Sequence, residues 1–204
     1  NESLAPRRTP PLLQKGNDAY ETRSAAEGIV TRADPVLWKS SSDVVVPTPL
    51  NISELSEYEE NGYLVLRGVF GMDELVACRR EAEQLEFNQA CETRVTHSSR
   101  TVTERGSNSL RSIFALHEDS RSAIGQCALS KQIVSCAQQL LGDDVYVHQS
   151  RLNFHVPFHG QGFSWHSDFE TWHAEDGMPT PRSLSAVIFL DRNLPMNGAI
   201  MVVP

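Results

Sequence analysis

The sequence predicts an α+β protein in which helices pack on a mostly antiparallel sheet or barrel. Three observations support this fold class. The 204 residues, 40% of them hydrophobic, are enough for one domain with a real core. Helix-like spacing of apolar residues is concentrated in residues 52–141, and strand-like alternation dominates from residue 144 onward. Helices followed by strands are typical of α+β proteins rather than of alternating α/β folds.

Residues 1–50 are predicted to form an extended N-terminal arm, because they contain more than half of the chain's eleven prolines. Within this arm, the stretch "DPVLW" is expected to dock Trp38 onto the body of the protein. Residues 51–204 are expected to be the N-terminal portion of a single domain. The chain stops at "NGAIMVVP", directly after a strand-like run and without a cap, which indicates that the C-terminal part is missing.

The elements of the first half follow from local signals. A short helix is expected to begin near residue 52, with Ser53 as its N-cap and Gly62 at its end. Residues 63–70, "YLVLRGVF", have the composition of a strand. Asp73 is expected to cap a helix that runs to about residue 88. Apolar residues recur along that helix at near-helical spacing: Leu75, Val76, Cys78, Ala82 and Leu85.

The second half starts with a polar stretch, residues 92–112, which is expected to be a long loop. One helix is predicted over residues 120–141, ending at Gly142. Two strands follow, one in "DVYVHQSRLNF" (144–154) and one in "LSAVIFL" (184–190).

The bulk properties exclude several classes of protein. A net charge of −8 disfavours nucleic-acid binding. No apolar run approaches the roughly 20 residues that span a membrane, and no secretory signal is visible. The four cysteines include no C-x-x-C pair, which favours buried, reduced thiols in a cytoplasmic protein. The chain starts with asparagine instead of methionine, so a short leader is left open.

His166 and Asp168 form the most specific local pattern, H-x-D. In a strand or its trailing loop, residues two apart face the same side, so the imidazole and the carboxylate would converge. Two histidines and one carboxylate form the facial triad of non-haem Fe(II) oxygenases, which leaves positions open for a bidentate 2-oxo acid and O2. His166 and Asp168 are therefore candidate iron ligands.

Other interpretations of this region remain open on spacing alone. An H-x-D tripeptide is often only a surface hydrogen bond. His173 could close a zinc site as H-x-D-x4-H, although a position next to the metal ligands, or on the surface, suits it better. Trp165 and Trp172 fit core packing, or a wall that binds a cationic ligand through cation–π contact.

The strand before this region carries Gln149, Arg151 and Asn153 at alternate positions. On an interior face, three polar residues are costly unless they are paired or bind a ligand. The alternative is that they face solvent while Leu152 and Phe154 form the core.

Taken together, the stretches "TVTERGSNSLRSIFALH", "VHQSRLNF", "FSWHSDFETWHAEDGMP" and "NGAIMVVP" resemble the ectoine hydroxylases of the phytanoyl-CoA dioxygenase superfamily. The resemblance extends from about residue 18 to the end. It implies a double-stranded β-helix (jelly-roll, cupin-like) core with flanking N-terminal helices. It also implies a dioxygenase that uses Fe(II), 2-oxoglutarate and O2. The expected reaction converts ectoine to 5-hydroxyectoine, a compatible solute made under osmotic stress, and a homodimer is left open.

The resemblance also assigns roles to individual residues. His166 and Asp168 would be the catalytic iron ligands. Gln149, Trp172 and Thr171 would bind ectoine. Asn153 would help to hold 2-oxoglutarate, and His155 occupies the position of a family lysine that contacts this cosubstrate.

The sequence departs from the family pattern at His155, which is shorter than lysine and only partly charged near neutral pH. Ser164 also stands where the family usually has tyrosine. The third iron ligand and the arginine that grips 2-oxoglutarate are expected beyond residue 204. These departures keep two alternatives open: a related hydroxylase of another small amino acid such as L-proline, and a non-catalytic jelly-roll binding protein. A zinc hydrolase that uses His166 and His173 is a third.

Overall fold

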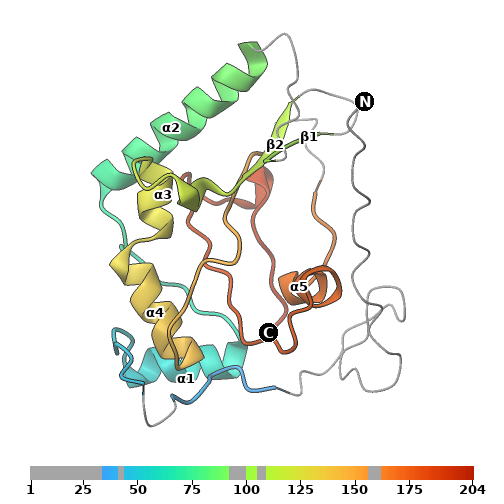
Figure 1. The fold of residues 1–204 in the computed structure, drawn as a ribbon. Helices are drawn as coiled ribbons and strands as arrows, with labels where there is room; N and C mark the ends of the chain where they lie inside the picture. Colours follow the sequence, from blue (N-terminus) through green and yellow to red (C-terminus); the bar gives the residue numbers. More distant parts are fainter. Residues whose placement is uncertain (1–33, 41–43, 92–99, 105–108, 156–161) are drawn as a thin grey trace, which may run out of the picture. The chain divides into compact units, whose positions relative to one another are not determined.

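The computed structural model describes residues 34–40, 44–91, 100–104, 109–155 and 162–204 (Figure 1). The chain forms two compact units. One comprises residues 1–35 and 164–185, and the other comprises residues 36–163 and 186–204. Parts of the predicted arm and of the predicted loop 92–112 lie outside the described residues. None of the described helices is both long enough and apolar enough to cross a membrane.

The first helix of the larger unit, α1 (Ile52–Asn61), is capped by Asn51 and not by Ser53 as predicted. The Asn51 side chain accepts a hydrogen bond from the Glu54 amide at 3.0 Å, and the Glu54 carboxylate accepts one from the Asn51 amide at 2.8 Å. This reciprocal capping box satisfies two amides that the helix itself leaves without partners. The predicted end at Gly62 is confirmed by its left-handed φ of 74°.

Helix α2 (Met72–Cys91) is longer than predicted at both ends. Asp73 lies inside its first turn, so the prediction that Asp73 caps the helix is wrong. The Gly71 amide instead donates a 2.7 Å hydrogen bond to the carboxylate of Glu74. Cys78 is the most deeply buried of the residues 72–88 in this helix, with 1% of its surface exposed. The apolar stripe therefore does face the core, although Val76 is exposed.

The single helix predicted over residues 120–141 is wrong, because the structure has two helices there. They are α3 (Ala123–Ala128) and α4 (Lys131–Leu141). The Ser122 hydroxyl accepts from the Gly125 amide at 2.8 Å, and the Ser130 hydroxyl accepts from the Ile133 amide at 3.4 Å. A serine side chain competes for backbone amides and favours a helix start over a helix interior. Gly142 ends α4 as predicted.

The sheet has three short antiparallel strands in the order β1-β2-β3. They are β1 (Thr101–Thr103), β2 (Leu110–Phe114) and β3 (Arg151–Asn153). Ser112 lies opposite Asn153, and Ile113 lies opposite Leu152. The expected antiparallel pairing is thus confirmed in a small sheet. The prediction of a loop over residues 92–112 is wrong where β1 and the start of β2 fall within it.

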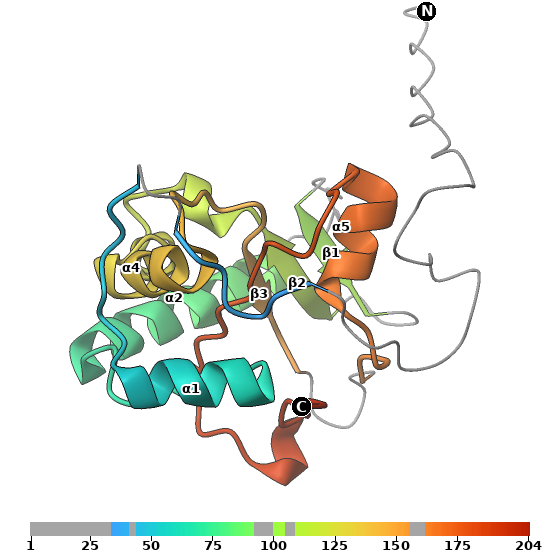
Figure 2. The same cartoon turned by 90° about the horizontal axis from the view of Figure 1, so that it is seen from below.

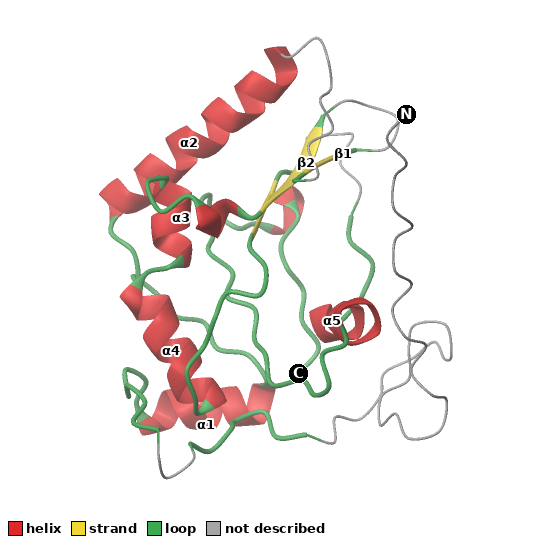
Figure 3. Ribbon diagram, viewed as in Figure 1, coloured by secondary structure: helices red, strands yellow, loops and turns green. Residues whose placement is uncertain are grey.

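Residues 63–70 and 184–190 lie outside helices and strands, so both strand predictions are wrong, and Figure 3 draws these segments as loop. Of the strand predicted over 144–154, Arg151–Asn153 forms β3, and backbone hydrogen bonds from Ala115 to Ser150 and from Phe154 to Arg111 extend the pairing at both ends. A strand requires a ladder of hydrogen bonds, which apolar alternation alone does not supply. Leu64 and Leu66 are half-buried and Val65 between them is exposed, so the alternation marks a more buried face there without a paired strand.

The described end of the predicted arm, residues 36–40 and 44–50, is hydrogen-bonded to the C-terminal end of α4 (Figure 2). The Trp38 amide donates to the Leu140 carbonyl at 3.0 Å. The Gln139 side chain accepts from the Leu50 amide at 2.7 Å and donates to the Leu50 carbonyl at 3.0 Å. Trp38 is half-buried. The expected docking of Trp38 onto the body is confirmed.

Candidate active site

His166 and Asp168 lie together in the smaller unit. The Nε2 atom of His166 is 3.6 Å from Oδ1 of Asp168, and about a third of each side chain is exposed. This separation is too long for a hydrogen bond, but both atoms can contact one metal cation placed between them. The structure therefore brings together the two candidate iron ligands that the H-x-D pattern predicts.

The imidazole of His166 is held by the backbone two residues earlier. Its Nδ1 lies 2.6 Å from the Ser164 carbonyl oxygen. A carbonyl can only accept, so Nδ1 carries the proton and donates it. In the neutral ring this leaves the lone pair on Nε2, the atom that faces Asp168.

Asp168 is held by a residue that spacing did not suggest. The Ser185 hydroxyl donates a 2.7 Å hydrogen bond to Oδ2 of Asp168, which leaves Oδ1 toward His166. Ser185 lies seventeen residues downstream, and no periodicity connects the two positions. Such partners orient ligating groups at metal sites.

The segment that carries these residues is a helix start and not a strand, which corrects the expectation for residues 166–168. Asp168 is the first residue of α5 (Asp168–Asp176), and the Ser167 amide donates to the Glu170 carboxylate at 3.4 Å. Negative charge is favourable in the first turn of a helix, because it faces the positive end of the helix dipole. The carboxylates of Asp168 and Glu170 thus help to fix where α5 begins.

The other candidate residues of this unit lie on α5. Trp172 is buried and Thr171 is half-buried, so Trp172 meets the core-packing expectation. Trp165 is 64% exposed and does not pack in the core of its unit. Gly177 ends α5 in a left-handed conformation, with a φ of 73°.

His173 is buried, which rules out the surface position considered for it. Its Nδ1 donates a 2.6 Å hydrogen bond to the Met178 carbonyl, and its ring stacks on Phe169 with centroids 5.3 Å apart. Among the described residues, no three histidine, cysteine or acidic side chains are grouped as a metal site would need. The described structure thus gives no support to the zinc site with His173.

The candidate residues of the larger unit lie on or beside β3. Gln149, Asn153 and His155 are exposed, whereas Leu152 and Phe154 are half-buried. The polar side chains of this strand are thus exposed, which leaves them accessible to solvent and to a ligand alike. Asn153 is not free on that face, because its Oδ1 accepts a 2.8 Å hydrogen bond from the buried Ser112 hydroxyl.

The imidazole of His155 lies between Phe163 and Gly198. Its ring meets that of Phe163 edge-on, with centroids 6.2 Å apart. Gly198, with a φ of 82°, lies beside it, and a Cβ at this glycine would be 3.0 Å from Nδ1 of His155. Glycine is favoured at this position, because it tolerates the left-handed backbone and leaves room for the imidazole.

Phe163 belongs to a cluster that sequence reasoning missed. The guanidinium of Arg111 lies over its ring at 4.1 Å and forms a 2.8 Å ion pair with the buried Glu104. A second guanidinium, that of Arg151, lies 5.8 Å from the same ring. No short motif links these residues, because they come from three separate segments of the sequence.

The donors of the smaller unit fit a divalent iron. One imidazole nitrogen and one carboxylate oxygen are two of the three ligand types of a facial triad. Each is oriented by a hydrogen bond through its other atom, to Ser164 and from Ser185. The described residues supply two ligands, and a complete triad needs a third.

Comparison with known proteins points to the same chemistry. The profile of the phytanoyl-CoA dioxygenase (PhyH) family matches residues 58–204. The ectoine dioxygenase of Streptomyces avermitilis is 41% identical over 187 residues, which cover 92% of this chain and 61% of that protein. The ectoine dioxygenase of Sphingopyxis alaskensis is 39% identical over 188 residues, covering 92% of this chain and 59% of that protein.

Solved structures are similar as well. The crystal structure of EctD from S. alaskensis with 2-oxoglutarate and 5-hydroxyectoine has a TM-score of 0.67 at 38% identity. That match covers 81% of this chain and 56% of the other. The structure of the same protein with bound Fe has a TM-score of 0.66 at 38% identity and covers 81% and 57%. The chain spans about three fifths of the length of the curated relatives it matches.

Proposed function

The chain belongs to the phytanoyl-CoA dioxygenase family, and we propose that the intact protein hydroxylates ectoine to 5-hydroxyectoine with Fe(II), 2-oxoglutarate and O2. One observation carries this proposal. The chain is similar over most of its length to ectoine dioxygenases and to an EctD structure that contains 2-oxoglutarate and 5-hydroxyectoine. The paired side chains of His166 and Asp168 agree with it.

In this proposal, His166 and Asp168 bind the iron. Donation from Nδ1 of His166 to the Ser164 carbonyl keeps the lone pair on Nε2 for the metal. The Ser185 hydroxyl holds one oxygen of Asp168 and leaves the other for the metal. Bound iron with 2-oxoglutarate and O2 would supply the oxidation, in which 2-oxoglutarate becomes succinate and CO2 and one oxygen atom goes to the substrate.

The remaining residues recognise the two organic molecules. Ectoine carries an amidinium cation and a carboxylate, which suit an aromatic face at Trp172 and polar groups at Gln149 and Thr171. Asn153 and His155 would hold 2-oxoglutarate. The bond from Ser112 fixes the Asn153 amide, so that its nitrogen stays available as a donor.

The same family relationship supports a domain organisation. We infer that residues 51–204 are the N-terminal portion of one dioxygenase domain with a jelly-roll core, preceded by an arm over residues 1–50. The likeness to EctD structures supports this core, since the TM-scores exceed 0.6. The third iron ligand and the 2-oxoglutarate arginine are then contributed by residues outside 1–204. The cytoplasmic location stays a prediction.

Product analysis tests the proposal. The full-length gene product would be incubated with Fe(II), 2-oxoglutarate, O2 and either ectoine or L-proline. We expect mass spectrometry to find one added oxygen on ectoine, equimolar succinate, and loss of both in a His166→Ala variant. A His148→Ala variant, which alters an exposed histidine outside the proposed ligand set, should keep activity.

Each other outcome assigns a different function. Oxygen added only to L-proline would keep the iron chemistry and replace the substrate. No turnover of 2-oxoglutarate with either compound, in a protein that binds ectoine, would support the non-catalytic jelly-roll binding protein.

A further inference from the structure

Two buried cysteines meet where α2 packs against α3. The sulfurs of Cys78 and Cys127 are 3.1 Å apart, and the two residues are 1% and 7% exposed. Both are free thiols. A disulfide bond is about 2.05 Å long, so the two sulfurs need to approach by only about 1 Å to form one.

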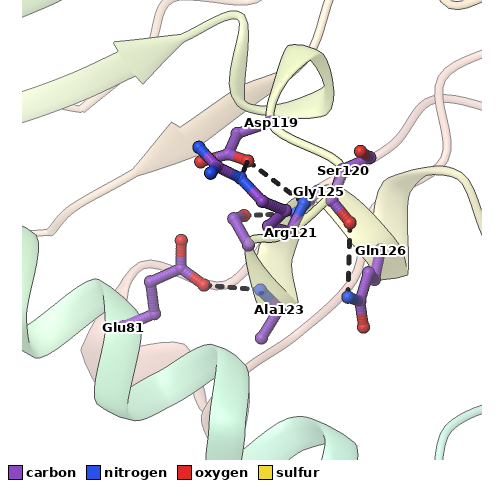
Figure 4. A network of polar contacts seen from close by, with 8 residues as sticks. Glu81, Asp119, Ser120, Arg121, Ala123, Gly125 and Gln126 are labelled. Carbon is purple, nitrogen blue, oxygen red and sulfur yellow. Dashed lines mark hydrogen bonds and ion pairs between the residues drawn. The ribbon is translucent and has the colours of Figure 1, made fainter.

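A second contact, one helical turn away, fixes the register of the two helices. Figure 4 shows the carboxylate of Glu81, on α2, accepting a hydrogen bond from the Ala123 amide at the start of α3, at 2.7 Å. The same oxygen accepts from the Ile124 amide at 3.2 Å. Glu81 is three residues after Cys78, and Ala123 is four residues before Cys127. The helices therefore run antiparallel, and the anchored end of α3 aligns the two thiols.

We propose that Cys78 and Cys127 are a modification site, which a peroxide or a thiol oxidant converts to an intramolecular disulfide. With hydrogen peroxide, one sulfur attacks an oxygen, the O–O bond breaks and water leaves, which gives a sulfenic acid. The second sulfur then displaces the hydroxyl as a second water and forms the S–S bond. Two thiols lose two electrons and two protons, and one peroxide is reduced to two waters.

The surroundings set the rate and the effect of this step. Burial, followed by the hydrogen bond with Cys127, raises the pKa of Cys78 to about 12. The thiolate is the reactive form, so attack by the Cys78 sulfur is slow at neutral pH. The bond would close a loop between positions 49 residues apart, which restricts the unfolded chain. Oxidation should raise the melting midpoint by about 5–15 °C.

Peptide mapping tests this proposal independently of the enzymatic function. The full-length protein would be treated with hydrogen peroxide or diamide, quenched with acid, alkylated with N-ethylmaleimide and digested with trypsin. Trypsin places Cys78 in peptide 68–79 and Cys127 in peptide 122–131, and Cys91 and Cys136 in two further peptides. We expect peptides 68–79 and 122–131 to be linked, with a combined mass two hydrogens below that of the free pair.

Matched variants sharpen the result. The Cys136→Ser variant should form the linked pair and show the rise in melting midpoint, whereas Cys78→Ser and Cys127→Ser should show neither. Dithiothreitol should reverse both changes in the wild type. The proposal is overturned if wild-type Cys78 and Cys127 remain fully alkylated after oxidation, or if either links instead to Cys91 or Cys136. The mapping in the wild type decides this even where a serine variant does not fold.

Discussion

The Ser185 hydroxyl donates a 2.7 Å hydrogen bond to Oδ2 of Asp168, while Oδ1 of the same carboxylate lies 3.6 Å from Nε2 of His166. One oxygen of Asp168 is thus committed to orientation and the other faces the imidazole. A carboxylate held in this way loses less rotational freedom when it binds a cation. The relationship assigns Ser185 a positioning role beside the two candidate ligands.

The first prediction concerns this positioning role. Ser185→Ala removes the hydrogen bond to Asp168, so we expect Fe(II) affinity to fall by about tenfold or more. Anaerobic titration of the full-length protein with Fe(II), or with Co(II) followed by absorbance, measures the change. Ser183→Ala is the matched control, because Ser183 is half-buried and its side chain makes no hydrogen bond within the described structure. Equal affinities in all three proteins would rule out the positioning role.

The second prediction concerns His155, and this prediction rests on the proposed function. A lysine there places a permanent charge where the family has one, so His155→Lys should lower KM for 2-oxoglutarate by up to about fivefold. KM for ectoine should stay the same. His148→Lys, on the same segment, adds the same charge at another exposed position. If the two variants lower KM for 2-oxoglutarate equally, the decrease comes from the added positive charge in general and not from a contact between residue 155 and the cosubstrate.

A third prediction uses two glycines with the same backbone conformation. Gly62 and Gly142 have φ values of 74° and 63°, but a Cβ at Gly62 would meet no atom, whereas one at Gly142 would lie 2.7 Å from the Trp38 carbonyl oxygen. Gly62→Ala should cost about 1–2 kcal/mol of unfolding free energy from backbone strain alone. Gly142→Ala should cost more, because it also displaces the segment that contains Trp38. Urea denaturation measures both, and equal losses would show that the segment contributes no stability.

The fourth prediction is a loss of stability at alkaline pH. Burial raises the pKa of the Cys78 thiol from 9.0 to about 12, with Cys127, Glu81 and Glu74 adding to the shift. The contribution of a group with a raised pKa is fully present below the unfolded value. It is lost as the pH rises from about 9 toward 12. The melting midpoint of the wild type should therefore fall more steeply over this range than that of Cys78→Ala, and parallel slopes would contradict the assignment.

The sequence predicted the pairing of His166 with Asp168 better than it predicted the strands. His166 and Asp168 were found because their pairing depends on residues two apart, and such local geometry survives a change from strand to helix start. Ser185 was not found, because its contact with Asp168 spans seventeen residues and depends on the fold. The same limit applies to Arg111 and Phe163, which meet across separate segments.

The C-terminal ends of helices were predictable where a glycine terminates them. The N-terminal starts were less predictable, because several nearby residues could each act as the cap. Gly62 and Gly142 were placed correctly, because few other residues adopt their backbone conformation. The sequence predicts Ser53 as a cap where Asn51 serves, and it places Ser130 inside a helix that Ser130 in fact starts, since asparagine and serine both suit several positions. The strand predictions for 63–70 and 184–190 are wrong because alternation indicates only which face is buried. A strand also needs a hydrogen-bonded neighbour, and the local sequence does not show whether one is present.

The order of the three strands has a consequence for the time course of folding. Thr103 and Leu110 on β1 and β2 are seven residues apart and can pair early, whereas Ser112 and Asn153 on β2 and β3 are forty-one residues apart. Closing the longer loop costs more entropy, and α3 and α4 lie within it. We expect β3 to gain hydrogen-exchange protection after α4 in a pulse-labelled refolding experiment. Asn153, which the proposed function places against 2-oxoglutarate, would then be ordered late, so cosubstrate binding would report the completion of folding instead of its beginning.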